Sequence, residues 1–153
     1  MFDVDIEDSH GSYRESDTFE AGDQLVVIDT PVGKVGLTIC YDLRFAEMHA
    51  KLVDLGAQII VNGAAFTRTT GQAHWHTLLR ARAIETQCYM LAASHGGQHD
   101  HRQTFGHSMI IDPWGEILVE LDEGPGIAVA CIDLDHLKTI RRAFPLQYQR
   151  RLK

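Results

Sequence analysis

The stretch KVGLTICYDLRF, residues 34–45, decides the fold. Its first half is mostly aliphatic or β-branched, and this composition predicts a strand. Residues 43–56 then carry apolar side chains largely at helical spacing and end in Gly56, a glycine where helices commonly stop. Cys40 is therefore predicted to lie at the carboxyl end of a strand, just before a helix.

The segments on either side of this stretch continue the alternation of strands and helices. Residues 24–30 predict another strand, joined to the first by a turn over residues 30–33 that contains proline and glycine. Downstream, residues 57–61 predict a short strand, residues 71–87 a helix and residues 88–94 a buried strand. The alternating order indicates an α/β fold.

The last third of the chain predicts further strands and one short helix. Asp133 or Asp135 is suited to cap a helix that runs to Arg142. Turn residues separate three strand-like runs before it, at residues 107–111, 116–121 and 127–132.

Three polar segments show no sustained period and are interpreted as loop or tail: residues 3–23, 95–103 and 144–153. No internal repeat and no low-complexity linker divides the chain. Residues 1–153 are therefore predicted to form a single domain.

The composition is that of a globular protein, because 44% of its 153 residues are hydrophobic and 23% are charged. A formal net charge of −7 leaves no basic stripe for phosphates, so we expect neither a nucleic acid nor a membrane as partner. Residues 1–10 lack the apolar segment of a signal peptide, and no apolar run approaches the roughly 20 residues that span a bilayer. We expect a soluble cytoplasmic protein that acts on a small polar metabolite.

Three cysteines, Cys40, Cys88 and Cys131, are widely spaced and include no Cys-x-x-Cys pair. This pattern predicts reduced thiols rather than a disulfide framework or a zinc ribbon. At a strand end before a helix, backbone N–H groups and the helix dipole favour an anion, so Cys40 is suited to be a thiolate. The alternative is a packed core cysteine, which is the commoner situation for a single free cysteine.

Residues 36–45, GLTICYDLRF, closely resemble the nucleophile motif of the nitrilase superfamily of carbon–nitrogen hydrolases. Within that superfamily the sequence is most similar to the Nit branch. The resemblance extends over essentially the whole chain. Later blocks of the family follow in order at residues 64–67, 71–75, 79–89, 106–108 and 112–116.

The resemblance implies an α/β fold that is part of a four-layer αββα sandwich, with the N-terminal segment missing from these residues. It implies an amidase that releases ammonia from a small carboxylate-bearing amide, such as deaminated glutathione, through a cysteine thioester. No cofactor and no metal are implied. The complete form is expected to be a homo-oligomer that dimerises through helices.

The resemblance also assigns roles to three residues. Cys40 matches the nucleophile, Glu15 matches a second glutamate that orients the site, and the backbone N–H of Tyr41 matches an oxyanion donor. In this chemistry the thiolate attacks the amide carbonyl, a carboxylate manages the proton, and N–H groups stabilise the tetrahedral intermediate.

Two further catalytic residues of the family have no match here. The family's lysine lies in an Arg-Lys-x-His-Leu-Phe-Asp motif, of which residues 1–3 correspond only to the end, and its general-base glutamate lies further upstream. Lys34 and Lys51 do not fall in that motif. We therefore expect little or no hydrolysis by residues 1–153 alone. The alternatives are a non-catalytic truncated remnant and one half of a split enzyme that needs a partner chain.

The histidines raise two other possibilities. His107 or His95 would activate Cys40 in a Cys-His hydrolase, but the spacing does not support that class. His74 and His76 point to different sides of the predicted helix and cannot jointly bind one ion.

The glycine-rich loop also contains ligand-type residues, but their spacing matches no standard tetrahedral site. No metal site is therefore expected among the four ligand-type residues of that loop, His95, His99, Asp100 and His101.

Overall fold

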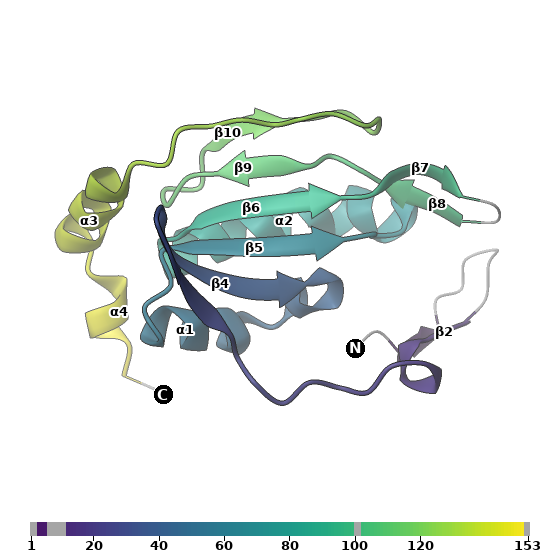
Figure 1. Cartoon of the computed structure of the whole chain (residues 1–153), viewed down its shortest axis with the longest axis horizontal. Helices are drawn as coiled ribbons and strands as arrows, with labels where there is room; N and C mark the ends of the chain where they lie inside the picture. The colour runs from purple at the N-terminus through teal and green to yellow at the C-terminus, as the bar shows by residue number, and fades with distance from the viewer. Residues whose placement is uncertain (1–2, 6–11, 100–101, 152–153) are drawn as a thin grey trace.

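A computed structural model of the chain describes residues 3–5, 12–99 and 102–151 (Figure 1). Its centre is a six-stranded sheet in the order β10-β9-β6-β5-β4-β3. Strands β4, β5 and β6 are parallel, and the other three are joined by antiparallel pairing. With helices on the sheet, this arrangement confirms the predicted α/β class. The strands are β3 (Val27–Thr30), β4 (Gly33–Ile39), β5 (Ile59–Ala64), β6 (Tyr89–Ser94), β9 (Met109–Ile111) and β10 (Ile117–Glu120).

Two helices, α1 (Ala46–Asp54) and α2 (Arg68–Thr86), pack against the same face of this sheet (Figure 1). Each follows a parallel strand, as crossover connections between parallel strands require. Among the described residues, no helix is both long and apolar enough to cross a bilayer. The main core forms between these helices and the sheet and includes Leu52, Ile60, Trp75, Leu79, Met90 and Ile111.

Both helices were predicted, and the structure confirms them with shifted starts. A tight 3-10 turn, η2 (Cys40–Arg44), follows β4, so α1 begins later than predicted. Gly56 follows α1 with a φ of +97°, which glycine adopts without strain. α2 begins earlier than predicted because the Thr67 side-chain oxygen accepts a hydrogen bond from the N–H of Thr70 at 3.3 Å and caps the helix.

A third helix, α3 (Leu134–Ala143), lies at the amino end of the central strands (Figure 1). Of the two predicted caps, Asp133 is the one used. Its Oδ1 accepts hydrogen bonds from the N–H groups of Asp135 and His136 at 2.9 and 3.0 Å. A small second core forms beside this helix from Ile59, Tyr89 and Leu137.

Two segments that were predicted as loops contain short hairpins. In the N-terminal segment, β1 (Asp3–Asp5) pairs with β2 (Ser12–Arg14), and η1 (Glu15–Asp17) follows. In the glycine- and histidine-rich segment, β7 (Gly96–His99) pairs with β8 (Arg102–Phe105). The loop predictions were wrong for these elements, because the strands are polar and backbone pairing rather than an apolar pattern holds them together. Residues 18–23 form a loop, as predicted.

The strand predicted over residues 127–132 is also wrong. Its alternating apolar pattern suits a strand, but a strand needs a hydrogen-bonded neighbour, and these residues have none among the described strands. Ile127 and Val129 are accordingly 88% and 79% exposed. In the tail, a short helix, α4 (Leu146–Gln149), forms where no element was predicted.

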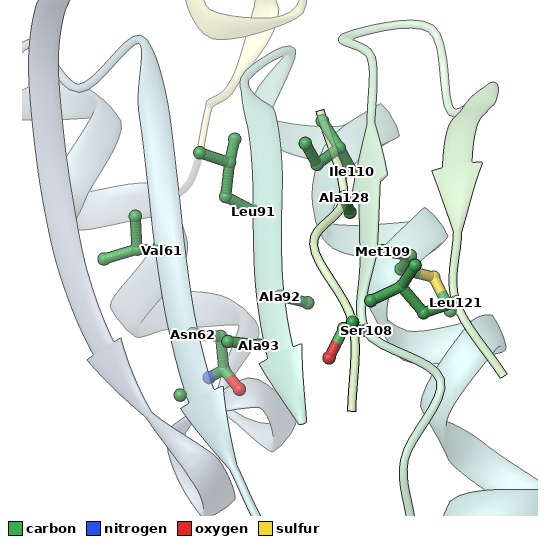
Figure 2. A pocket seen from close by; sticks show the side chains of 12 residues that line it. Val61, Asn62, Leu91, Ala92, Ala93, Ser108, Met109, Ile110, Leu121 and Ala128 are labelled. Carbon is green, nitrogen blue, oxygen red and sulfur yellow. The ribbon is translucent and has the colours of Figure 1, made fainter. Parts of the chain in front are cut away.

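The sheet face opposite α1 and α2 is apolar and largely open. Alternate residues of the strands point toward it, among them Leu37 and Ile39, which are 38% and 72% exposed. Parallel strands are usually buried on both faces, and the expected sandwich would cover this face with a second sheet. A hollow of about 490 Å³ lies on it, crossed by the segment that contains Ala128 (Figure 2). Its lining includes Val61, Leu91, Ala93, Ile110 and Leu121.

We predict that residues 1–153 expressed alone self-associate or form a molten state. Each large apolar side chain left in water forfeits about 1.5–3 kcal/mol, and a few of them consume a typical net stability of roughly 5–15 kcal/mol. Exposed apolar patches also favour aggregation. Size-exclusion chromatography combined with near-UV circular dichroism measures both outcomes.

Charge on the open face should reduce this association. The double substitution Leu37→Lys and Ile39→Lys should lower the apparent mass, because it places two charges on the exposed sheet. Tyr148→Lys is the matched control, since Tyr148 is 90% exposed on α4, away from the sheet. A monodisperse monomer with a cooperative thermal transition, formed by the unsubstituted chain, would contradict the prediction.

Candidate active site

Cys40 occupies a strained turn at the carboxyl end of β4. Its φ is +47°, a left-handed value that residues with a β-carbon rarely adopt. The backbone N–H of Ile39 donates to Asp42 Oδ2 at 2.9 Å, and the N–H of Phe45 donates to the Asp42 carbonyl at 3.0 Å. Asp42 thus holds both sides of the turn, with Cys40 at its tip.

The surroundings of the Cys40 thiol favour its neutral form. Partial burial raises its pKa above the ordinary thiol value. The backbone N–H groups of Ala65 and Tyr41 lower the pKa and favour the thiolate, while the negative charges of Glu15 and Asp42 raise it. Because the net pKa is raised, the resting group at pH 7 is a thiol, and a nucleophilic attack requires a base that removes its proton.

Of the three residues predicted for the site, Cys40 and Tyr41 are neighbours in η2, and the charge of Glu15 contributes to the raised pKa of Cys40. Glu15 is the first residue of η1 and exposed, and it lies close enough for its charge to act on Cys40. The preceding strand, β2, lies beyond the carboxyl end of β4 in Figure 1. The backbone N–H of Tyr41 favours the thiolate form of Cys40. The catalytic roles of these three residues stay predictions.

Ala65 is a backbone donor that was not predicted from the sequence. It follows β5, which runs parallel to β4 with Ile39 aligned to Gly63. Because the carboxyl ends of parallel strands meet at the same edge, the residues after β5 lie beside Cys40. Only the order of the strands in the sheet, which the sequence alone does not give, could have identified this donor.

The described lysines lie on other parts of the molecule. Lys34 is at the opposite end of β4 from Cys40, roughly 20 Å away at about 3.3 Å per residue. Its Nζ lies 3.1 Å from an oxygen of Asp29. Lys51 is exposed on α1, and Lys138 is on α3.

Arg44 places a permanent positive charge at the end of the same turn. Its guanidinium carbon lies 5.2 Å from the ring centroids of both Tyr41 and Phe66. Its Nη1 lies 3.3 Å from Nδ1 of His74. Because a guanidinium matches the geometry of a carboxylate, this cation suits an anionic group held close to the nucleophile.

The histidines of the rival Cys-His site contact other groups. His107 Nδ1 lies 2.8 Å from a carboxylate oxygen of β10, and the ring of His95 stacks on that of His99 with centroids 4.0 Å apart. The charges that act most on Cys40 are carboxylates rather than histidines. Residues 100–101, which belong to the cluster considered as a metal site, lie outside the described residues.

The α/β fold and the cysteine turn are consistent with a carbon–nitrogen hydrolase. The chain belongs to this family, whose model matches residues 1–142. A deaminated glutathione amidase of Yersinia enterocolitica is 52% identical over 152 residues, covering 98% of this chain and 53% of that protein. The protein of the same name from Bos taurus is 48% identical over 153 residues, covering 99% and 46%. The chain thus spans about half the length of the curated relatives it matches.

Solved structures agree with this assignment. The NitFhit protein of Caenorhabditis elegans superposes with a TM-score of 0.90 at 43% identity, covering 99% of this chain and 37% of that one. Nit3 of Saccharomyces cerevisiae, a nitrilase-superfamily member, has a TM-score of 0.84 at 38% identity, covering 90% and 51%. An amidase of Nesterenkonia sp. AN1, with acrylamide added to its active-site cysteine, has a TM-score of 0.71 at 29% identity, covering 88% and 53%. The predicted membership of the nitrilase superfamily is confirmed.

We predict that Cys40 reacts slowly with iodoacetamide at pH 7. The thiolate is the reactive form, so a raised pKa means that the alkylation rate climbs only as the pH passes the ordinary thiol value of about 8.5. Peptide mass spectrometry follows each cysteine separately, and the exposed Cys131 serves as the internal reference.

The variant Glu15→Gln should move the inflection of this Cys40 profile to lower pH, because it removes a negative charge that raises the pKa of the thiol. Glu20→Gln, an exposed change in the following loop, is the control and should leave the profile in place. If Glu15→Gln leaves the pH profile of Cys40 alkylation unchanged, the Glu15 charge does not act on Cys40.

Proposed function

We propose that this chain carries the nucleophile of an amidase that releases ammonia from a small carboxylate-bearing amide, such as deaminated glutathione. The observation that supports it most is the strained turn that presents the Cys40 sulfur to the backbone N–H groups of Ala65 and Tyr41. The names of the relatives support the reaction class and the substrate. The acrylamide adduct of the Nesterenkonia amidase supports a cysteine as the reactive group.

In the proposed reaction the Cys40 thiolate attacks the amide carbon and forms a C–S bond. The carbonyl oxygen becomes an oxyanion that accepts a hydrogen bond from the backbone N–H of Tyr41. The C–N bond then breaks, and the nitrogen takes up a proton and leaves as ammonia. Water hydrolyses the resulting thioester to the carboxylic acid and returns the thiol.

The proton of the Cys40 thiol requires a base, because burial keeps the resting group neutral. Glu15 is proposed to orient the site, as the second glutamate does in the family, and the general base and the lysine are proposed to come from outside residues 1–153. These residues alone should therefore show little or no hydrolysis. The alternative is a non-catalytic remnant, or one half of a split enzyme that acts only with a partner chain.

Arg44 is proposed to bind the carboxylate of the substrate. Its guanidinium lies at the end of the nucleophile turn, and the aromatic rings of Tyr41 and Phe66 hold it in place. A fixed cation that pairs with a carboxylate positions the amide for attack. The expected cytoplasmic location and homo-oligomeric state stay predictions.

We predict that ammonia release from deaminated glutathione depends on Cys40. Residues 1–153 are assayed alone and together with the remaining part of the Yersinia enterocolitica relative. The chain alone should be inactive, and the combination should be active. Cys40→Ala should reduce that activity to background, and Glu15→Gln should lower kcat by up to about 100-fold, because a misplaced nucleophile loses that much.

Arg44→Gln should act mainly by raising KM, since it removes a binding charge, whereas an equivalent change at the exposed Arg142 of α3 should have no effect. Turnover by residues 1–153 alone would refute the need for a general base and a lysine from outside these residues. Turnover that survives Cys40→Ala would refute the nucleophile. If the two parts bind each other but release no ammonia, the alternative of a non-catalytic remnant would be favoured.

A further inference from the structure

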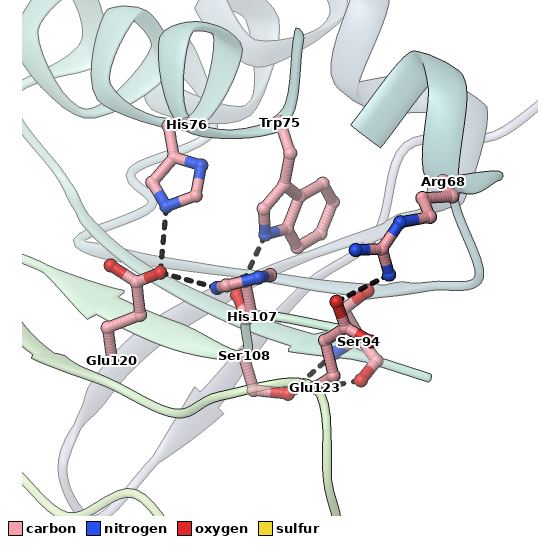
Figure 3. Close-up of polar contacts among 8 residues, drawn as sticks. All are labelled: Arg68, Trp75, His76, Ser94, His107, Ser108, Glu120 and Glu123. Carbon is pink, nitrogen blue, oxygen red and sulfur yellow. Dashed lines mark hydrogen bonds and ion pairs between the residues drawn. The ribbon is translucent and has the colours of Figure 1, made fainter. Parts of the chain in front are cut away.

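Three potential metal ligands meet at a second place in the molecule, beside the β10 edge of the sheet. His76 comes from the middle of α2, His107 from the turn between β8 and β9, and Glu120 from the end of β10. His76 Nε2 and His107 Nδ1 each lie 2.8 Å from Glu120 Oε1, and the three ligand atoms all lie within 4.8 Å of one another. Figure 3 shows both rings turned toward the same carboxylate oxygen.

This cluster is separate from the cysteine turn. Four strand spacings separate β10 from β4 in the sheet, or roughly 19 Å at about 4.8 Å per spacing. The cluster lies on the α2 side of the sheet, as the contribution of His76 requires. The proposed amidase reaction uses none of its three residues.

The two imidazoles are held by packing as well as by the carboxylate. The Trp75 Nε1–H donates to the carbonyl of His107 at 2.8 Å, which fixes the backbone of a residue with a φ of +57° (Figure 3). The ring of Phe105 lies 4.3 Å from the ring of His107 and 5.9 Å from that of His76. Behind Phe105, Gly71 leaves no room for movement, because a β-carbon there would lie 2.3 Å from the Phe105 side chain.

The geometry needs only a small change to hold an ion. Two nitrogens and one carboxylate oxygen are a ligand set that zinc and other borderline divalent metals prefer, whereas calcium and magnesium prefer oxygen alone. Ligands on a tetrahedral zinc with bonds of about 2.0–2.1 Å lie about 3.3 Å apart. Glu120 belongs to an edge strand and its side chain is 30% exposed, so its carboxylate has room to retreat.

We propose that His76, His107 and Glu120 form a binding site for a divalent transition metal of the zinc class, with a fourth position open to solvent. The metal replaces the two protons that now lie between the rings and the carboxylate. A neutral ring keeps its single proton, which moves to the nitrogen that does not bind the metal, whereas a protonated ring releases one proton to solvent. The bound ion ties edge strand β10 to α2.

Cobalt(II) titration tests the site in the assembly of residues 1–153 with the remaining part of the Yersinia enterocolitica relative, which is the parent protein here. Cys40→Ala and Cys131→Ser are introduced first, so that accessible thiols do not compete. The expected result is one saturable cobalt with d–d absorption, no thiolate-to-cobalt charge-transfer band, and displacement by zinc. His76→Ala and His107→Ala should each weaken binding by at least about 10-fold, and His74→Ala, on the same helix, should leave the affinity unchanged.

His76→Gln separates a metal site from a hydrogen-bonded cluster. Glutamine still donates an N–H to Glu120 but is a poor ligand, so cobalt affinity should fall while the melting temperature without metal stays the same. Zinc should raise the melting temperature of the parent protein and of His74→Ala, but not that of His76→Gln. Absence of saturable cobalt binding, or binding that survives His76→Ala and His107→Ala, would overturn the proposal and leave a hydrogen-bonded cluster only.

Discussion

The parallel pairing of β4 with β5 is the contact on which the candidate active site depends. A buried polar link fixes this pairing: Thr38 donates its hydroxyl to the Val61 carbonyl at 2.8 Å, and Asn62 Nδ2 donates to the Thr38 hydroxyl oxygen at 2.9 Å. With the register set, both strands end at the same edge. The backbone N–H of Ala65 then reaches the sulfur of Cys40. A slip of one residue would turn every side chain of β5 to the other face and remove this donor.

The central sheet connects two requirements, a base for the Cys40 thiol and a cover for the open apolar face. Burial leaves the Cys40 thiol neutral, so an additional base is required, and the apolar face that carries Leu37 and Ile39 lacks a covering layer among the described residues. Both Ile39 and Cys40 lie at the carboxyl edge, so a second layer packed on the open face would also border the thiol. In the sandwich that the family resemblance implies, one such layer would meet both needs.

Local pattern predicted much of the framework. The apolar runs of β4, β5 and β6, the helices between them and the cap at Asp133 were all predictable, because each rests on a short-range signal. The strand prediction for residues 127–132 was wrong because an alternating pattern does not show whether a partner strand exists. The hairpins β1–β2 and β7–β8 were missed for the opposite reason, since backbone pairing needs no apolar pattern.

The residues of the candidate site also differ in how far the sequence predicts them. Cys40 was suspected from its place after a strand, but Glu15 was assigned only through family resemblance, because nothing in the spacing links it to the thiol. Ala65 required the strand order. The His76 and His107 contacts to Glu120 span 44 and 13 residues, so only the fold reveals them.

The central claim is that Cys40 forms an acyl thioester with a small carboxylate-bearing amide. The most direct measurement is rapid acid quenching of the active assembly during turnover of deaminated glutathione, followed by peptide mass spectrometry. The account predicts a transient acyl group, equal in mass to the substrate without ammonia, on the peptide that contains Cys40. Turnover with that peptide unmodified at every quench time, or with the acyl group on Cys88 or Cys131, would contradict it.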